Sequence, residues 1–119
     1  MNGKELNEMI DFIREQLPDE ELLAQLAEEC NELAQAALKM RRVLDGKNPT
    51  PVKLTVAYDN LVEEIGDVKL VLRVLGYHMD DPGYDIAVER KLRRWTDRLH
   101  QAAASGIWED KTESGLLEE

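Results

Sequence analysis

Four acidic residues of this 119-residue chain have a spacing that suits metal binding. Glu29 and Glu32 are three residues apart, as are Glu64 and Asp67, and residues three apart on a helix share a face. Two facing helices would present these carboxylates to one another, and like charges that close repel unless a cation neutralises them. A set of oxygen ligands without histidine favours a hard ion, Mg²⁺ or, as a substitute, Mn²⁺.

Two of these acids also interrupt apolar stripes. Glu29 lies at helical spacing between Leu26 and Leu33. Glu64 lies in the same way between Leu61 and Val68. Burying an ionised carboxylate without a partner is costly, so such positions are seldom accidental. Either motif alone is typical of a solvated helix face, but the pair, in register with two stripes, indicates a site.

The elements that must position these acids are predicted to be helices, because Leu, Ala and Glu abound while Gly and Pro stand at intervals. We expect helices over about Lys4–Gln16, Asp19–Leu44, Val52–Leu75 and Tyr84–Ser105, the second capped by Asp19. The apolar stripes of the last three helices comprise Leu22, Leu26, Leu33, Ala37, Met40 and Leu44; Leu54, Ala57, Leu61, Ile65, Val68, Leu72 and Leu75; and Val88, Leu92, Trp95, Leu99 and Ala102. An all-α four-helix bundle over residues 1–105, followed by an acidic tail over 106–119, is the predicted fold.

Composition narrows the classes of protein further. A net charge of −10 disfavours nucleic-acid binding, because phosphates would be repelled. The apolar runs are too short for a membrane span, and the polar N-terminus does not resemble a secretory signal. A single cysteine, Cys30, fits a reducing cytoplasm.

The segments Leu26–Lys39 and Asn60–Leu72 resemble the all-α nucleoside triphosphate pyrophosphohydrolases, the MazG-like family, whose signature is EExxE on one helix and ExxD on the next. The resemblance implies Mg²⁺-dependent hydrolysis of a (d)NTP to the monophosphate and pyrophosphate, a housekeeping reaction of the nucleotide pool. It further implies homodimers or homotetramers. Its metal ligands would be Glu29, Glu32, Glu64 and Asp67.

Other groups have roles that follow from this chemistry. A spare carboxylate, Glu28 or Glu32, would accept a proton from the attacking water. Lys39 shares a helix face with Glu32, and Asn60 stands four residues before Glu64. Lys91, Arg94 and Arg98 share one face of the last helix, and all five residues are candidates for substrate binding. The family often carries K-x-x-x-N-x-x-R on its last helix; Lys91 and Arg98 match it, whereas Trp95 stands in place of the asparagine.

The alternative is a non-catalytic helical module that oligomerises or binds nucleotides without turnover. No phosphate-binding GxxxxGK[ST] loop, GxGxxG or HExxH occurs in the chain. Release of pyrophosphate would separate the two hypotheses.

Overall fold

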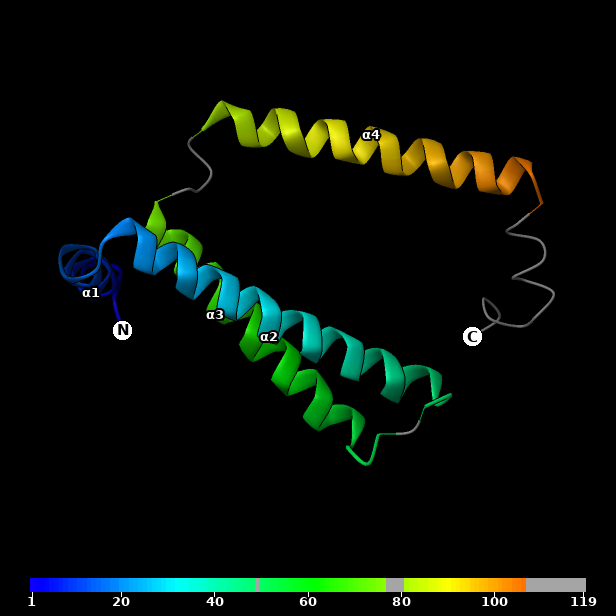
Figure 1. Ribbon diagram of the computed structural model, residues 1–119, viewed down its shortest axis with the longest axis horizontal. Coiled ribbons are helices and arrows are strands. Elements are labelled where there is room, and N and C mark those ends of the chain that lie inside the picture. Colours follow the sequence, from blue (N-terminus) through cyan, green and yellow to red (C-terminus); the bar gives the residue numbers. More distant parts are fainter. Residues whose placement is uncertain (49, 77–80, 107–119) are drawn as a thin grey trace. The chain divides into compact units, whose positions relative to one another are not determined.

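The computed structural model describes residues 1–48, 50–76 and 81–106, and in these ranges it contains four helices and no strand (Figure 1). The all-α prediction is confirmed. The helices are α1 (Gly3–Gln16), α2 (Asp19–Asp45), α3 (Leu54–Leu75) and α4 (Pro82–Ala104). Two compact units divide the chain: Met1–His78 holds α1 to α3, and Met79–Glu119 holds α4. None of the helices in the described ranges is long and apolar enough to cross a bilayer.

Local chemistry sets the helix ends, and the starts of α2 and α4 differ from expectation. Pro18, not Asp19, occupies the N-cap of α2 and makes no side-chain cap, so Asp19 is the first helical residue. In the first turn, the negative charge of Asp19 interacts favourably with the helix dipole. Helix α4 begins two residues early, because the Asp81 side chain accepts a hydrogen bond from the Gly83 amide and Pro82 suits the first turn.

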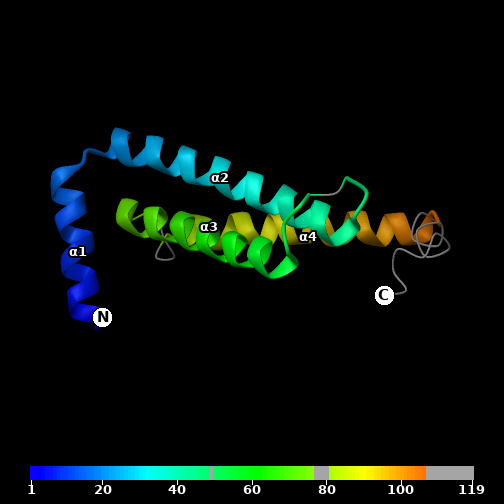
Figure 2. The same ribbon diagram turned by 90° about the horizontal axis from the view of Figure 1, so that it is seen from below.

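The pair α2–α3 is the centre of the first unit. The two helices run antiparallel and side by side (Figures 1 and 2). Positions 22, 26, 33, 36 and 40 of α2, and 57, 61, 68, 71 and 75 of α3, are buried or half-buried. Their alternating steps of three and four residues are those of two helices that pack along a seam. Glu29 and Glu64 take the remaining step in each series, so both lie at the middle of the seam.

This seam corrects the predicted stripes at particular positions. Ala36, not Ala37, is buried on α2, at 3% exposure. Leu44, Leu54 and Ile65 were expected inside but are exposed. At Ala37, Leu44 and Ile65 the predicted stripes stepped by four where this seam steps by three, because a seam follows a 3.5-residue period. Leu54 keeps the seam spacing, but it is the first residue of α3.

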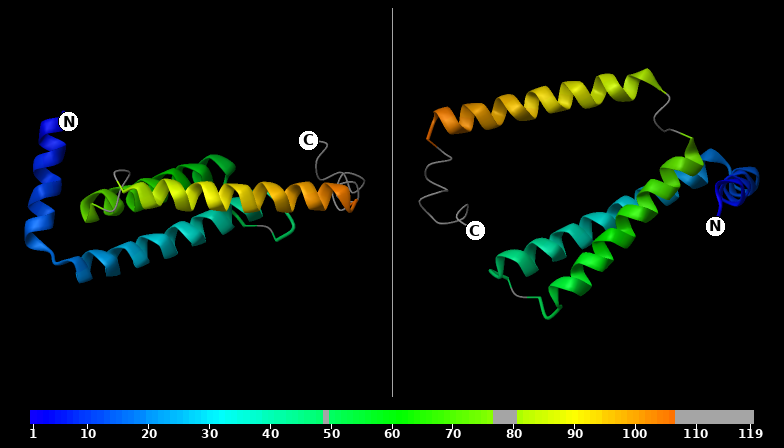
Figure 3. Two further views of the ribbon diagram at one scale, coloured as in Figure 1. Left: turned by 90° about the horizontal axis from the view of Figure 1, so that it is seen from above. Right: turned by 180° about the vertical axis from the view of Figure 1, so that it is seen from behind.

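Helix α1 crosses the end of the pair where α2 begins and α3 ends (Figures 2 and 3). Arg14 fastens it there: its Nε donates to the Val74 carbonyl oxygen at 2.6 Å and its Nη2 to that of Arg73 at 2.8 Å. These carbonyls lie in the last turn of α3, where intrahelical donors run out. Gly76, at φ 78°, ends α3, and a Cβ there would lie 3.3 Å from Arg14 Nη2. A glycine therefore suits both the turn and the close approach.

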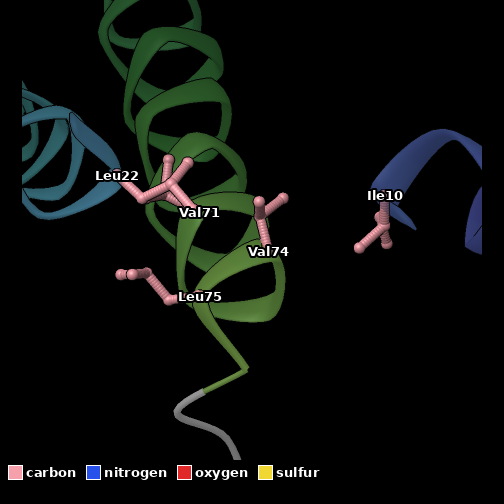
Figure 4. Packing of buried hydrophobic residues seen from close by; sticks show 5 residues of the cluster. All are labelled: Ile10, Leu22, Val71, Val74 and Leu75. Carbon is pink, nitrogen blue, oxygen red and sulfur yellow. The ribbon is translucent and has the colours of Figure 1, made fainter. Parts of the chain in front are cut away.

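A small core forms where the three helices meet. Figure 4 shows Val71, Val74 and Leu75 on α3, with Leu22 from α2 and Ile10 from α1. Leu6, Ile13 and Leu26 pack against this cluster and are partly buried. The core fixes the register of α2 against α3, and with it the position of the acids.

Within residues 81–106, the described part of the second unit, helix α4 has no core of its own. No residue of α4 is buried, and four members of its predicted stripe are exposed: Val88, Leu92, Trp95 and Leu99. The expectation that Trp95 lies in a core is therefore not met within the described chain. The predicted acidic tail falls on residues 106–119, of which all but Gly106 lie outside the described residues.

Candidate metal centre

The two acidic motifs converge. Glu29 and Glu32 on α2 and Glu64 and Asp67 on α3 each offer a carboxylate oxygen, and these oxygens all lie within 4.8 Å of one another. Glu32 is exposed and the other three are half-buried. We call these four residues the acidic cluster. Oxygens at such distances, drawn from two facing helices, form a ligand set of the kind that a hard divalent cation takes.

Two carboxylate oxygens of the cluster have no hydrogen-bond partner among the described residues. Glu29 Oε2 and Glu64 Oε2 are both buried, and neither has a hydrogen-bond partner among the described residues. Buried carboxylate oxygens are normally hydrogen-bonded or bound to a metal, because desolvation without compensation is costly. The other oxygen of Glu29 is satisfied, since Gln25 Nε2 donates to Glu29 Oε1 at 2.8 Å. The cluster thus offers unsatisfied oxygens that a cation would satisfy.

The electrostatics of Glu64 reflect the same crowding. Desolvation raises the pKa of Glu64 above its usual value, and the neighbouring charges of Glu32, Asp67 and Glu29 raise it further, together with a side-chain hydrogen bond to Glu32. Each of these effects disfavours the ionised form. A bound cation would reverse the balance, because an opposite charge favours ionisation.

A polar pocket of about 310 Å³ opens beside the acidic cluster. Glu32 and Glu64 form one side of it, and the predicted substrate residues Lys39 and Asn60 contribute to the rest. Arg42 also lines it and donates from Nε to Thr50 Oγ1 at 3.0 Å. Cationic and amide groups therefore lie next to the carboxylates, as a metal-bound phosphate would require.

A second, more apolar pocket of about 280 Å³ lies against the other two acids, Glu29 and Asp67. Its remaining lining comes from all three helices of the first unit: Ile13, Leu17, Leu22, Gln25, Leu70, Val71 and Val74. The acidic cluster thus separates a polar pocket from an apolar one.

The other predicted site residues do not join the cluster. Glu28 is exposed on α2 and is not one of the four converging acids. Lys91, Arg94 and Arg98 share one face of α4, where they line a pocket with Asp97 and Gln101. They belong to the second unit, and their predicted part in substrate binding stays a prediction.

Two residues at the site were not predicted. Arg42 has a sequence signal, because it stands three residues after Lys39 and shares its face. Gln25 has a weaker one: it stands four residues before Glu29, a spacing that permits a hydrogen bond but does not require it.

Comparison with known proteins adds no relative. The chain matches no protein-family profile, no curated protein and no solved structure. The resemblance to the MazG-like family therefore rests on the two acidic motifs.

Proposed function

We propose that this protein is an Mg²⁺-dependent nucleoside triphosphate pyrophosphohydrolase of the MazG-like type, which converts a (d)NTP and water to the (d)NMP and pyrophosphate. The observation that carries the proposal is the convergence of Glu29, Glu32, Glu64 and Asp67, with ligand oxygens within 4.8 Å of one another. Two of these residues have buried oxygens without a partner among the described residues. These features support a cation site rather than a solvated acidic face.

The four carboxylates would hold Mg²⁺, with Mn²⁺ as a substitute. When bound, the ion neutralises phosphate charge and makes water a better nucleophile. Polyphosphate binding by a chain with a net charge of −10 needs such a neutralising ion, since the phosphates would otherwise be repelled.

The chain's own groups would bind the phosphates and move the proton. Lys39, Arg42 and Asn60 line the pocket beside Glu32 and Glu64, which supports a role in holding the phosphates. Attack of water on the α-phosphorus breaks the bond to the bridging oxygen, and pyrophosphate leaves with that oxygen. Glu32 is the better-supported proton acceptor, because it lies in the cluster and lines the pocket, whereas Glu28 lies outside the cluster.

The bundle and the assembly are also part of the proposal. Helix α4 would pack its apolar stripe against other helices, of its own chain or of a second copy, in a homodimer or homotetramer. The exposed stripe residues Leu92, Trp95 and Leu99 support this, because a run of large apolar side chains along one helix face is characteristic of a covered surface. Lys91, Arg94 and Arg98 would then serve as phosphate-binding groups.

The decisive experiment is release of pyrophosphate from a panel of dNTPs in the presence of Mg²⁺. We expect turnover of at least one dNTP, and we expect Glu64→Gln to lower kcat by two orders of magnitude or more, a typical cost of removing a group that stabilises transition-state charge (~10²–10³). Glu63→Gln is the matched control: it makes the same change one residue earlier on α3, at an exposed position outside the cluster.

Two results would contradict the proposal. Folded protein that is silent on every dNTP would favour the non-catalytic alternative, a helical module that oligomerises or binds nucleotides. Turnover that Glu64→Gln and Glu63→Gln reduce equally would mean that the acidic cluster is not the site.

A further inference from the structure

Gln25 contacts the acidic cluster from outside it. It lies on α2 one turn before Glu29, and its Nε2 donates to Glu29 Oε1 at 2.8 Å. Within residues 1–48, 50–76 and 81–106, Glu29 is the one member of the cluster that accepts a hydrogen bond from a side chain outside it. This contact distinguishes Glu29 from the other three acids.

The two carboxylate oxygens of Glu29 have different surroundings. Oε1 is held by the amide of Gln25, and Oε2 is buried without a partner among the described residues. We propose that Gln25 is a positioning residue: it holds Glu29 in the rotamer that leaves Oε2 for the cation. This inference rests on the proposed function, because it assigns Gln25 a part in that same metal site.

The chemistry of an amide suits this task. A neutral N–H donor fixes a ligating carboxylate without cancelling its negative charge, which a lysine at the same place would do. Gln25 also lines the apolar pocket with Leu17 and Leu70.

Gln25→Met tests the proposal, because methionine has a similar length and no donor. The readout is the Mg²⁺ concentration that gives half of the maximal rise in melting temperature, measured with MgCl₂ at constant ionic strength and without substrate. We expect this concentration to increase about tenfold, the lower end of the effect of removing a hydrogen bond to a metal ligand. Gln25 is exposed, so the variant should keep its helical content.

Two further variants make the result specific. Gln25→Asn keeps an amide but is one methylene too short, so it should also raise the half-saturating Mg²⁺ concentration. Asn31→Leu is the matched control, because it replaces an exposed amide of α2 that does not belong to the cluster by an apolar group. It should leave the half-saturating concentration unchanged.

The outcomes separate this inference from the proposed function. If Mg²⁺ stabilises the parent but Gln25→Met and Gln25→Asn shift the half-saturating concentration less than twofold, or no more than Asn31→Leu does, Gln25 is not a positioning residue. If Mg²⁺ does not stabilise the parent at all, the metal site itself is wrong and this inference is overturned with it.

Discussion

The α2–α3 pair carries the acidic half of the predicted site, and helix α4 carries three of its cations. The two regions differ in how their side chains are packed. The pair packs along a seam with buried alanines and a small core, and it places the four carboxylates together. Helix α4 carries cations on one face and an apolar stripe, yet none of its residues is buried. The acids are therefore positioned by contacts within the first unit, whereas the cations of α4 share a face only with residues of their own helix.

This difference in packing follows from which contacts order the side chains of each region. Two helices joined by a short loop meet along a seam, and residues of the same seam come together without help from other elements. The site residues of α4 share a face only with one another. We infer that contacts within the first unit place the acidic cluster, and that the proposed phosphate binding by α4 would require the complete bundle.

The largest expected effect concerns the stability of the two regions. Leu22 lies in the core and is 3% exposed. Leu22→Ala should therefore lower the free energy of unfolding of the protein by roughly 2–4 kcal/mol. Leu92 lies on the α4 stripe and is 60% exposed. If the proposed bundle or dimer covers this side chain, Leu92→Ala should lower the free energy of unfolding by at least about 1 kcal/mol. Urea unfolding measures both values.

Ile86→Ala is the control for this pair of variants, since Ile86 is exposed on α4 but lies off the stripe. It should change stability by less than about 0.5 kcal/mol. If Leu92→Ala costs no more than Ile86→Ala, the stripe is solvated and the proposed bundle is wrong.

The contrast between the regions also explains what the sequence alone could predict. Spacing within a helix is local, so the pairing of Glu29 with Glu32 and of Glu64 with Asp67 on their helix faces was predictable, and their convergence is borne out by the geometry. The step from Leu33 to Ala36 was missed, because the seam period depends on the partner helix. The hydrogen bond from Gln25 depends on two rotamers, which no spacing determines.

Capping was predictable only in part. Asp19 is a good capping residue by type, yet the extended backbone of Pro18 already occupies the cap. At the start of α4 the aspartate cap does form, one residue before Pro82. The same residue type thus caps one helix and not the other, because the neighbouring proline decides where the helix begins.

A smaller effect tests whether α4 reaches the site at all. Arg94→Gln and Arg98→Gln should each raise KM for the triphosphate about tenfold, as the loss of one charge-assisted hydrogen bond would. Arg93→Gln is the control, because Arg93 does not line the α4 pocket and its Nη2 pairs with Glu89 Oε1 at 2.9 Å. Steady-state pyrophosphate release gives kcat and KM; equal effects of all three variants would remove α4 from the substrate site.

The smallest expected effect is the pH dependence of the metal-free protein, and it tests the first region alone. Burial and the charges of Glu32, Asp67 and Glu29 raise the pKa of Glu64 in the folded state. Between the unfolded and the raised folded pKa, the folded state binds more protons, so stability falls as pH rises through this window. Glu64→Gln removes that titration. In the presence of a chelator, the melting temperature of the variant minus that of the parent should therefore increase from acidic to neutral pH and then stay constant.

Saturating Mg²⁺ should cancel this gain, because the cation stabilises the ionised form that the parent alone can adopt. Glu63→Gln should follow the parent at every pH, since Glu63 is exposed and outside the cluster. Thermal melts of the three proteins, with chelator and with Mg²⁺ at matched ionic strength, measure the effect. Parallel curves for Glu64→Gln and Glu63→Gln would mean that Glu64 is an ordinary solvated glutamate, and the difference between the two regions would then lie in packing and not in charge.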